Sequence, residues 1–504
     1  MSGNSDPHGG IRRPTPPPRR RWPWAAAVVL LVAAGVTAYL LISQKMDECG
    51  SGVRRTGPQN ECVGVSDGSY AFRSSLKPVM DKIKEENRRV EKSGRKWVSV
   101  AYVEPLSSDP NDEAAKYQIV EELKGAYLAQ RQLNDNQLGG LGDLPQIRLL
   151  VANIGERSQQ WKPLTDQLIA MAHGKDRLVA VAGFGTSRGG TLKAVDALRA
   201  AKVPMMGATV TADALSSASA VGFFRVSAPN SDQASAAAAY LAGQQRARHG
   251  YKVLVIRDRN QDDIYNTSLY KDFMTAAGAK KLALMDGEVQ YASGIDGISN
   301  AFSAVAQQVC YKKPDAIFFA GRGANLRGLV IAMSAAGRRC PVTVLTGDDA
   351  VGVYYDANTP DATVKQFQRD WTVSRMTVLY TALGHPGLPE RLYAKADNPY
   401  TGFVELYRRT FGGTGDEELQ DGQATLGHDA VWTLGVAIHQ AAGDDGSATV
   451  NAESTLSQLV TGVTAAGVTG PIQLDSDGNP HDKPMAIVRL DPRGTYTFEQ
   501  VIKP

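Results

Sequence analysis

The sequence predicts an α/β protein whose main body forms two doubly wound parallel-sheet lobes. From residue 97 onward, short apolar runs alternate with longer amphipathic stretches, which is the texture of repeated strand–helix units. The runs are nearly continuous in apolar residues, as strands of a sheet covered on both faces must be. About eleven such runs are too many for one comfortable open sheet. Two lobes of similar size therefore fit the pattern better than one.

The predicted strands are 97–103, 147–154, 178–184, 203–209, 223–227, 252–258, 282–289, 316–321, 342–346, 377–381 and 485–490. The stretches between them carry apolar residues at spacings of three and four, which predicts helices, most clearly over 113–133, 160–172 and 190–201. Ligands of doubly wound sheets bind beyond the carboxyl ends of the strands. We therefore expect functional residues in the turns that follow these runs.

The positive charge of the chain is concentrated at its N-terminus. The protein has 504 residues, with 55 Lys and Arg against 52 Asp and Glu. Residues 1–21 hold five arginines and one aspartate, so the remaining residues are close to neutral and no basic body indicates a nucleic-acid partner. The Gly, Pro and Arg content of residues 1–21 predicts a disordered tail.

Residues 22–42 contain no charged side chain, and a helix of this length spans the hydrocarbon layer of a bilayer. The segment is longer than the 7–15 apolar residues of a cleavable signal peptide. The arginines before it predict a cytoplasmic N-terminus and an extracytoplasmic body. We thus expect a single-pass anchor in the cell membrane. Residues 43–96, with a charged helical run over 79–92, are expected to form a stalk.

Four cysteines, Cys49, Cys62, Cys310 and Cys340, all follow the predicted anchor. Four cysteines allow three pairings, of which Cys49 with Cys62 and Cys310 with Cys340 is the simplest. An oxidising compartment favours disulfides. Neither a CxxC motif nor a histidine cluster accompanies them, so a metal site is disfavoured. We expect neither a metal nor a cofactor.

The turn after the run 178–184 reads Gly-Phe-Gly-Thr-Ser-Arg-Gly-Gly and opens a helix. It matches the G-x-S-x-G nucleophile elbow, with Ser187 as nucleophile and Asp349 and His428 as triad partners in the right chain order. An HGGG-type oxyanion segment is missing from the upstream loops, and the five-residue pattern arises easily among 50 glycines. A serine hydrolase is therefore the weaker hypothesis, and the chain is expected not to be an enzyme.

Two other interpretations of this turn use its glycines differently. A dinucleotide-binding G-x-G-x-x-G fails because Arg188 stands at the third glycine. An anion nest uses backbone N–H groups with the hydroxyls of Thr186 and Ser187 at a helix N-terminus. The next turn, 203–211, supports the nest, since Thr209 and Thr211 offer a carbonyl and a hydroxyl at the same sheet edge.

An ordered set of motifs resembles a known family. The set begins with Gly-Ala-Tyr-Leu-Ala at 125–129 and the two turns above. It continues with Phe-Arg-Val-Ser-Ala-Pro-Asn-Ser-Asp-Gln at 224–233, Leu-Thr-Gly-Asp-Asp at 345–349 and Gly-Pro-Ile-Gln-Leu-Asp-Ser-Asp-Gly-Asn at 470–479. Residues 97–504 thereby resemble extracytoplasmic solute-binding proteins of the branched-chain amino-acid (Leu/Ile/Val-binding) type, with the periplasmic-binding-protein type I fold. The resemblance implies lobes of 97–227 with 347–465 and of 228–346 with 466–504, joined by crossover hinges.

The resemblance also implies roles for individual residues. Ser187 and Thr211 would hold the α-carboxylate of an amino acid, and Thr209 and Asp349 its α-ammonium group. Tyr265 would cover the ligand. Tyr117 or Gln118 falls where the family has a lid residue. Asn230 and Gln423 depart from the family pattern and leave side-chain specificity open.

The function implied is capture of a small zwitterionic ligand between two lobes for an ABC-type transporter, with a permease as a separate partner. A ligand sensor of the same fold, signalling through a partner, is the alternative, because no signalling domain lies on this chain.

Overall fold

The computed structural model describes residues 27, 29–31, 48–107, 113–135, 144–218, 220–294, 297–335, 340–355, 359–413, 418–444 and 446–504. The predicted tail and most of the predicted anchor, 22–42, lie outside these ranges. Within them, no helix combines the length and apolar character that a membrane span requires. Residues 49–504 form one compact unit, which contains the two lobes described below.

The first lobe is built on an eight-stranded sheet in the order β1-β2-β3-β5-β4-β6-β7-β8. From β5 to β8 the neighbours are parallel, whereas β3 pairs antiparallel with β5 and β2 with β3. The parallel part has the doubly wound order 2-1-3-4-5. The strands are β1 (Glu48–Gly50), β2 (Val53–Thr56), β3 (Glu61–Ser66), β4 (Trp97–Glu104), β5 (Gln146–Asn153), β6 (Leu178–Gly183), β7 (Met205–Gly207) and β8 (Phe223–Arg225).

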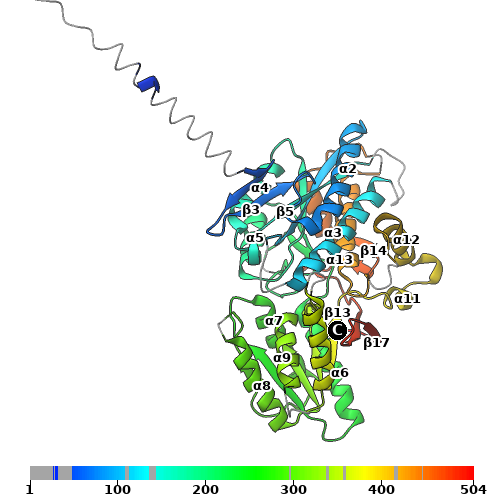
Figure 1. The fold of residues 1–504 in the computed structure, drawn as a ribbon. Helices are drawn as coiled ribbons and strands as arrows, with labels where there is room; N and C mark the ends of the chain where they lie inside the picture. The colour runs from blue at the N-terminus through cyan, green and yellow to red at the C-terminus, as the bar shows by residue number, and fades with distance from the viewer. Residues whose placement is uncertain are drawn as a thin grey trace, which may run out of the picture. The chain divides into compact units, whose positions relative to one another are not determined.

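Helices cover both faces of this sheet (Figure 1). One face packs against α2, α3 and α13, with α12 and α14 beside them, and the other against α4 and α5. The β strands between these layers are buried almost throughout, which accounts for their continuous apolar character. The helices are α2 (Lys77–Lys92), α3 (Glu113–Asn134), α4 (Trp161–Ala172), α5 (Gly189–Ala200), α12 (Pro399–Phe411), α13 (Gln423–Ala442) and α14 (Ala452–Thr461).

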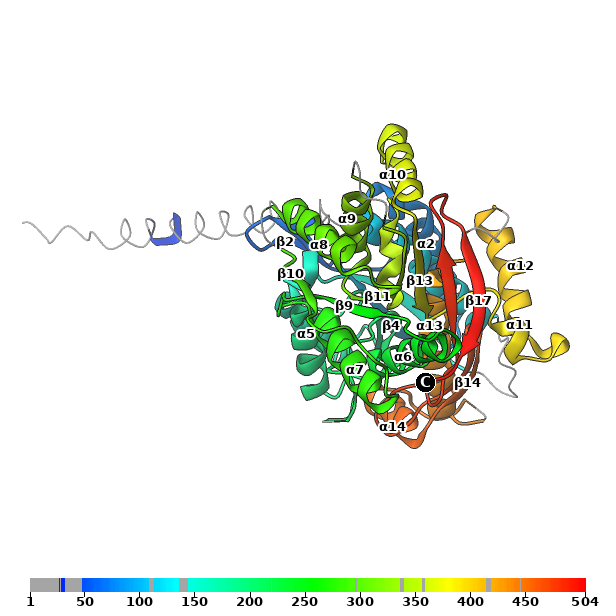
Figure 2. The same ribbon diagram turned by 90° about the horizontal axis from the view of Figure 1, so that it is seen from below.

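The second lobe is built on a seven-stranded sheet in the order β10-β9-β11-β12-β13-β16-β17. Its first five strands are parallel and repeat the 2-1-3-4-5 order, and β16 and β17 add an antiparallel edge. Figure 2 shows helices on both sides of this sheet. The strands are β9 (Val253–Asp258), β10 (Val289–Tyr291), β11 (Ala316–Ala320), β12 (Val342–Thr346), β13 (Met376–Ala382), β16 (Met485–Leu490) and β17 (Tyr496–Ile502).

One face of the second sheet packs against α8, α9 and α10, and the other against α6 and α7. Stacked aromatic rings of Phe273 and Phe318 lie in the second of these cores. A short β14–β15 hairpin and α11 complete the described elements. The bounds are α6 (Asn230–Ala247), α7 (Ile264–Ala279), α8 (Ile298–Lys312), α9 (Gly323–Ser334), α10 (Asp361–Ser374), α11 (Pro389–Leu392), β14 (Thr464–Gly467) and β15 (Gly470–Gln473).

The sheets correct two boundaries expected from the sequence. Residues 48–66 and α2 belong to the first lobe rather than to a stalk, because β3 pairs with β5 and α2 buries Met80 and Ile83 in the first core. Residues 376–382, expected in the first lobe, form β13 of the second sheet and pair with β12 and β16. The chain therefore returns to the first lobe only after β13. The strand predicted at 282–289 is observed later, as β10.

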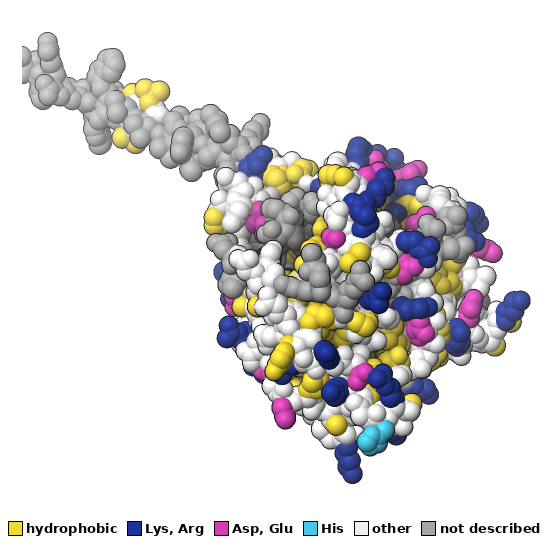
Figure 3. Space-filling view, turned by 60° about the horizontal axis from the view of Figure 1, so that its bottom comes forward, with side chains coloured by type: hydrophobic (Ala, Val, Ile, Leu, Met, Phe, Trp, Pro, Cys, Tyr) yellow, Lys and Arg dark blue, Asp and Glu magenta, His cyan; other side chains and the backbone are white. Residues whose placement is uncertain are grey.

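Both predicted disulfides are confirmed, Cys49 with Cys62 and Cys310 with Cys340. The first joins β1 to β3 in the edge of the first sheet, and the second joins α8 to the segment that enters β12. Basic and acidic side chains are interspersed over the face of the molecule shown in Figure 3. This distribution agrees with the near-neutral charge expected for the main body.

Candidate functional site

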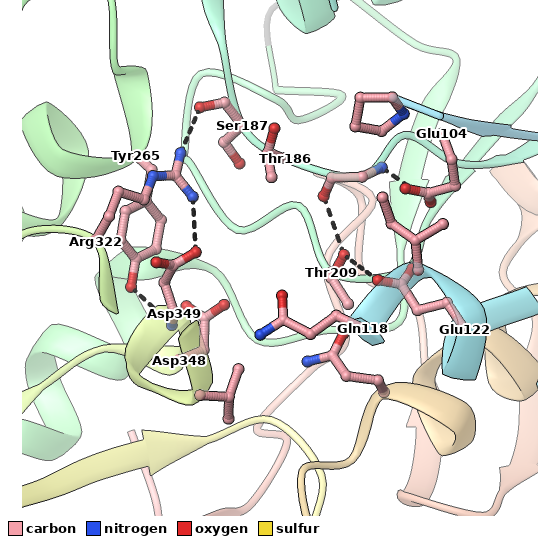
Figure 4. A pocket seen from close by; sticks show the side chains of 15 residues that line it. Glu104, Gln118, Glu122, Thr186, Ser187, Thr209, Tyr265, Arg322, Asp348 and Asp349 are labelled. Atoms are coloured by element: carbon pink, nitrogen blue, oxygen red, sulfur yellow. Dashed lines mark hydrogen bonds and ion pairs between the residues drawn. The ribbon is translucent and has the colours of Figure 1, made fainter. Parts of the chain in front are cut away.

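A cavity lies where the carboxyl ends of the strands of both lobes meet. The space within it, together with the open solvent at its mouth, amounts to about 480 Å³. Figure 4 shows its lining side chains. Those labelled come from the end of β4, from the segments after β6 and β7 and from α3 in the first lobe, and from α7 and the segments after β11 and β12 in the second. The lining residues are Glu104, Pro105, Gln118, Ile119, Glu122, Gly185, Thr186, Ser187, Thr209, Tyr265, Arg322, Asp348, Asp349, Val351 and Gln423.

The β6–α5 turn supplies the hydroxyls of Thr186 and Ser187. Three successive residues before them have positive φ, +89° at Gly183, +79° at Phe184 and +57° at Gly185. Glycine adopts this region without steric cost, and burial of the Phe184 ring in the core holds the intervening residue. The turn thereby reverses the chain sharply and presents the next two side chains to the cavity.

Ser187 is 2% exposed, and its Oγ accepts hydrogen bonds from the amides of Thr211 and Ala212 at 3.1 and 3.2 Å. A hydroxyl also carries one hydrogen to donate. With both amides directed at its lone pairs, the Ser187 hydroxyl is oriented to donate into the cavity. It is thus suited to an anionic or carbonyl oxygen of a ligand.

Arg322 is the basic residue of the cavity lining. Its guanidinium stacks over Tyr265, 4.4 Å from the ring centroid. It donates to both carboxylate oxygens of Asp263, at 2.8 and 3.0 Å, and to Asp349 at 3.1 Å. Burial opposes ionisation of Asp263, but the charges of Arg322 and Arg188 outweigh it and hold its pKa below the ordinary value.

These charged residues also connect the two lobes. Arg322 donates to the carbonyl oxygen of Ser187 at 3.0 Å, and Arg188 of the first lobe forms an ion pair with Asp263 of the second at 2.7 Å. The hydroxyl of Thr211 donates to Asp348 at 3.3 Å. The lobes are therefore held together along one side of the cavity.

The opposite side of the cavity is acidic, and Figure 4 shows Glu104 and Glu122 next to each other there. Glu104 ends β4 and accepts from the Gly185 amide at 3.2 Å. Glu122 accepts from the hydroxyls of Tyr102 and Thr209 at 2.9 and 3.3 Å. Burial raises the pKa of Glu122 to about 8. Burial and the neighbouring charge of Glu122 raise that of Glu104 well above its ordinary value.

Asp348 and Asp349 lie on the turn after β12. Asp349 accepts from the Gly323 amide at 2.7 Å as well as from Arg322. Asp348 accepts from the side-chain amide of Gln233 at 2.9 Å. Burial, then the charge of Asp349, raises the pKa of Asp348 to about 7.

The structure brings most of the residues singled out in the sequence to this cavity. Thr186, Ser187, Thr209, Tyr265, Asp349 and Gln118 line it. Thr211 stands behind Ser187, with its amide and hydroxyl bonded to other protein groups. The side chain of Tyr117 lies outside the described residues. Gln423, which departs from the family pattern, is part of the lining.

The hydrolase triad is not assembled. Both ring nitrogens of His428 are engaged away from Ser187, with Asp429 at 3.0 Å and Gln132 at 2.7 Å. Asp349 bonds to Arg322 and Gly323 rather than to an imidazole. A nucleophilic serine needs a base within hydrogen-bond reach, and the described contacts of Ser187 are with backbone groups.

Sequence reasoning missed Glu104, Glu122, Arg322 and Asp348 as lining residues. Two signals were present. Glu104 and Arg322 directly follow buried strands, at the strand ends where ligands of such sheets bind. Glu122 interrupts the apolar stripe of a helix, three residues after Ile119.

Comparison with known proteins identifies the family. The receptor family ligand-binding region matches residues 122–493. The chain belongs to this family. The family binds ligands, in agreement with the prediction that the chain is not an enzyme. No curated protein sequence matches the chain.

Solved structures similar to this family member are type I substrate-binding proteins. One is the branched-chain amino acid transporter substrate-binding protein LivJ of Streptococcus pneumoniae in complex with isoleucine, with 19% identity, 81% of this chain and 100% of that chain covered, and a TM-score of 0.59. The leucine-binding protein LivK of Thermotoga maritima has 19% identity, 81% and 99% coverage and a TM-score of 0.56. A solute-binding protein of R. palustris in complex with benzoate has 15% identity, 81% and 97% coverage and a TM-score of 0.55. At these identities the likeness establishes the fold.

Proposed function

We propose that this protein is an extracytoplasmic solute-binding protein that captures a small amino-acid-like ligand between its lobes. One observation carries the proposal. The Ser187 and Thr186 hydroxyls of the first lobe face Tyr265, Arg322 and Asp349 of the second across a single cavity. A ligand there contacts both lobes at once, so its binding energy favours the closed arrangement over an open one.

The polar groups suit a zwitterion. The Ser187 and Thr186 hydroxyls, with the Arg322 guanidinium nearby, offer donors to a carboxylate. Asp348 and Asp349 offer acceptors to an ammonium group on the facing wall. Charge-assisted hydrogen bonds of this kind are about twice as strong as neutral ones. The similar structures named above include complexes with isoleucine and with benzoate, and both of these ligands carry a carboxylate.

Thermal unfolding of the full-length chain, purified in detergent, tests the proposal against a panel of amino acids. A ligand at 100 times its Kd stabilises the protein by about 2.7 kcal/mol. Ser187→Ala combined with Thr186→Val should abolish that shift. Thr461→Val, an exposed threonine on α14, is the matched control and should retain it. A panel that shifts neither protein, or a shift unaffected by the double variant, would contradict an amino-acid site in this cleft.

We also propose that residues 22–42 anchor the protein in the cell membrane, with the body outside and an ABC-type permease as its separate partner. The support is the charge-free segment behind five arginines. A chain beginning at Cys49 should leave the membrane fraction, whereas the full-length chain should stay in it with its body open to external protease. Retention of the shortened chain in washed membranes would count against the anchor.

A further inference from the structure

The Glu104–Glu122 pair is the part of the cavity that the zwitterion hypothesis does not use. The two carboxyls come from different elements, β4 and α3, and are 0% and 3% exposed. The Tyr102 hydroxyl donates to one oxygen of Glu122, and the Thr209 hydroxyl lies 3.3 Å from the other but shares its one hydrogen with the nearer Gly185 carbonyl. Glu104 has one donor, the Gly185 amide at Oε1. Its other oxygen, Oε2, is buried and has no amide or hydroxyl donor among the described residues. The carboxyl of Glu104 instead shares a side-chain hydrogen bond with that of Glu122, which requires a proton on one of the two.

Charges around the pair do not compensate it. Among the described lining residues Arg322 carries the positive charge, and it is bonded to Asp263 and Asp349. The charge of Arg73 lowers the pKa of Glu104, but burial and the charge of Glu122 outweigh it, and the charge of Asp421 raises the pKa of Glu122 further. A buried carboxylate without a partner is costly. In the ligand-free protein a proton shared between the two carboxyls therefore takes the position that a cation would occupy.

The lining of the cavity also contains aliphatic groups. Ile119, Val351 and Pro105 are among its residues, and they suit a short chain of methylene groups. Among the described residues, no group of three or more His, Cys, Asp or Glu side chains could hold a metal ion. The chemistry that remains for two adjacent carboxyls is an organic cation.

We propose that the ligand is a basic amino acid whose side-chain ammonium or guanidinium group lies between Glu104 and Glu122. The proposal rests on the function proposed above and specifies the class of its ligand. The carboxylate of this ligand lies at Ser187 and Thr186, its methylene groups contact aliphatic residues of the lining, and its cationic end replaces the proton shared by Glu104 and Glu122. Since a guanidinium is planar and forked, arginine can bridge both carboxyls at once.

Isothermal titration of the full-length chain with matched pairs of amino acids tests directly whether the side-chain cation of the ligand contributes to binding. Arginine is compared with citrulline, and lysine with norleucine, because each pair differs mainly in the cationic group. We expect the cationic member of at least one pair to bind at least about 30-fold more tightly, the lower limit for losing one partner of a buried charge pair. Equal affinities within both pairs would overturn the proposal while leaving an amino-acid site intact.

Variants of Glu104 and Glu122 test whether these two side chains cause the preference for a cationic ligand. Glu104→Gln and Glu122→Gln should each reduce the preference for the cationic member by at least about tenfold. Glu86→Gln is the control, because Glu86 is also a buried first-lobe glutamate but bonds to Arg89 and Asn134 outside the cavity. Thermal unfolding without ligand checks that each variant folds. An unchanged preference in both cavity variants would refute the assignment.

Two further measurements distinguish the proposed cation site from the more general proposal that the protein binds an amino acid. Binding at pH 7 in phosphate and in Tris should give different heats, because a cation displaces protons from the Glu104–Glu122 pair; identical heats would contradict that displacement.

The second measurement compares arginine with agmatine, which lacks the carboxylate of arginine. Agmatine binding as tightly as arginine would support the cation site and refute the amino-acid function. Loss of agmatine binding with retention of arginine binding supports both.

Discussion

The guanidinium of Arg322 in the second lobe donates a hydrogen bond to the backbone carbonyl of Ser187 in the first, at 3.0 Å. The same guanidinium holds Asp263, which in turn pairs with Arg188 of the first lobe. Lobe closure and ligand binding therefore share one set of charges. Ser187 is held by its carbonyl on one side and directs its hydroxyl to the cavity on the other.

Replacing Asp263 with alanine should open and destabilise the protein. Asp263 is 1% exposed and lies between two arginines. Its removal breaks the ion pair with the partly buried Arg188 and leaves the buried Arg322 with Asp349 as its carboxylate partner, which costs about 3 kcal/mol. Urea unfolding measures the loss, and small-angle scattering should show a larger radius of gyration. Asp196→Ala, which breaks a pair with Arg199 in which Asp196 is 59% exposed, should cost under about 1 kcal/mol. Similar losses in the two variants would argue against the interlobe role of Asp263.

The acidic cavity predicts an unusual dependence of stability on pH. The pKa of Glu122 rises on folding from 4.5 to about 8, and those of Asp348 and Asp421 from 3.8 to about 7. A raised pKa means that the folded state holds its proton more tightly, so this stability is complete below the unfolded value and is lost as pH rises toward 8. The ligand-free protein should therefore unfold more easily at pH 8 than at pH 6.

Denaturant unfolding at pH values from 5 to 9 measures the slope of the free energy of unfolding against pH. Glu122→Gln should flatten this slope, because an amide does not titrate, whereas Glu85→Gln on the exposed face of α2 should leave it unchanged. Asp263 and Asp429 have lowered pKa values and act in the opposite sense, but only as pH falls below about 4. A stability that rises between pH 6 and 8 would contradict protonated carboxyls in the empty cleft.

The disulfide between Cys310 and Cys340 should contribute more stability than that between Cys49 and Cys62. The sequence separations are 30 and 13 residues, and loop-closure entropy gives about 3.7 and 3.0 kcal/mol. Calorimetry of the two Cys-to-Ser pair variants measures each contribution. A greater loss from the Cys49–Cys62 variant would show that the edge strands β1–β3 depend on their disulfide in a way that loop length does not describe.

Much of this architecture could be predicted because it is local. Continuous apolar runs such as 178–184 identify buried strands wherever they pair, and the turn after a parallel strand carries the site in either lobe. The segment 48–66 could not be recognised in this way. Its β2 reads Val-Arg-Arg-Thr, which resembles a polar linker until it pairs at the sheet edge.

The missed site residues could not be predicted for a different physical reason. Glu104 and Glu122 are 18 positions apart in sequence, and nothing local indicates that the end of β4 meets the third turn of α3. Their contact depends on how α3 packs against β4, and α3 in turn packs closely on α13. Arg322 and Ser187 likewise belong to different lobes, so their bond depends on the closed arrangement rather than on either segment.

That close approach depends on glycine and yields the final prediction. A Cβ on Gly125 of α3 would stand 1.8 Å from the carbonyl oxygen of Ala424 in α13, and one on Gly427 would stand 2.1 Å from that of Glu122. Backbone atoms cannot yield as a flexible side chain can, so Gly125→Ala must separate the helices. The expected loss is about 3 kcal/mol or more in urea unfolding, with weaker ligand binding because Glu122 and Gln423 move apart.

Gly402→Ala is the matched control for that substitution. Gly402 is an exposed residue within α12, and a Cβ there meets nothing within 4 Å. Alanine at this position should stabilise the protein by about 0.5–1 kcal/mol, because glycine is the poorer residue inside a helix. If Gly125→Ala were as harmless as Gly402→Ala, the two helices would have to be able to separate without cost. Glu122 would then not be held against Glu104 by the packing of α3 on α13.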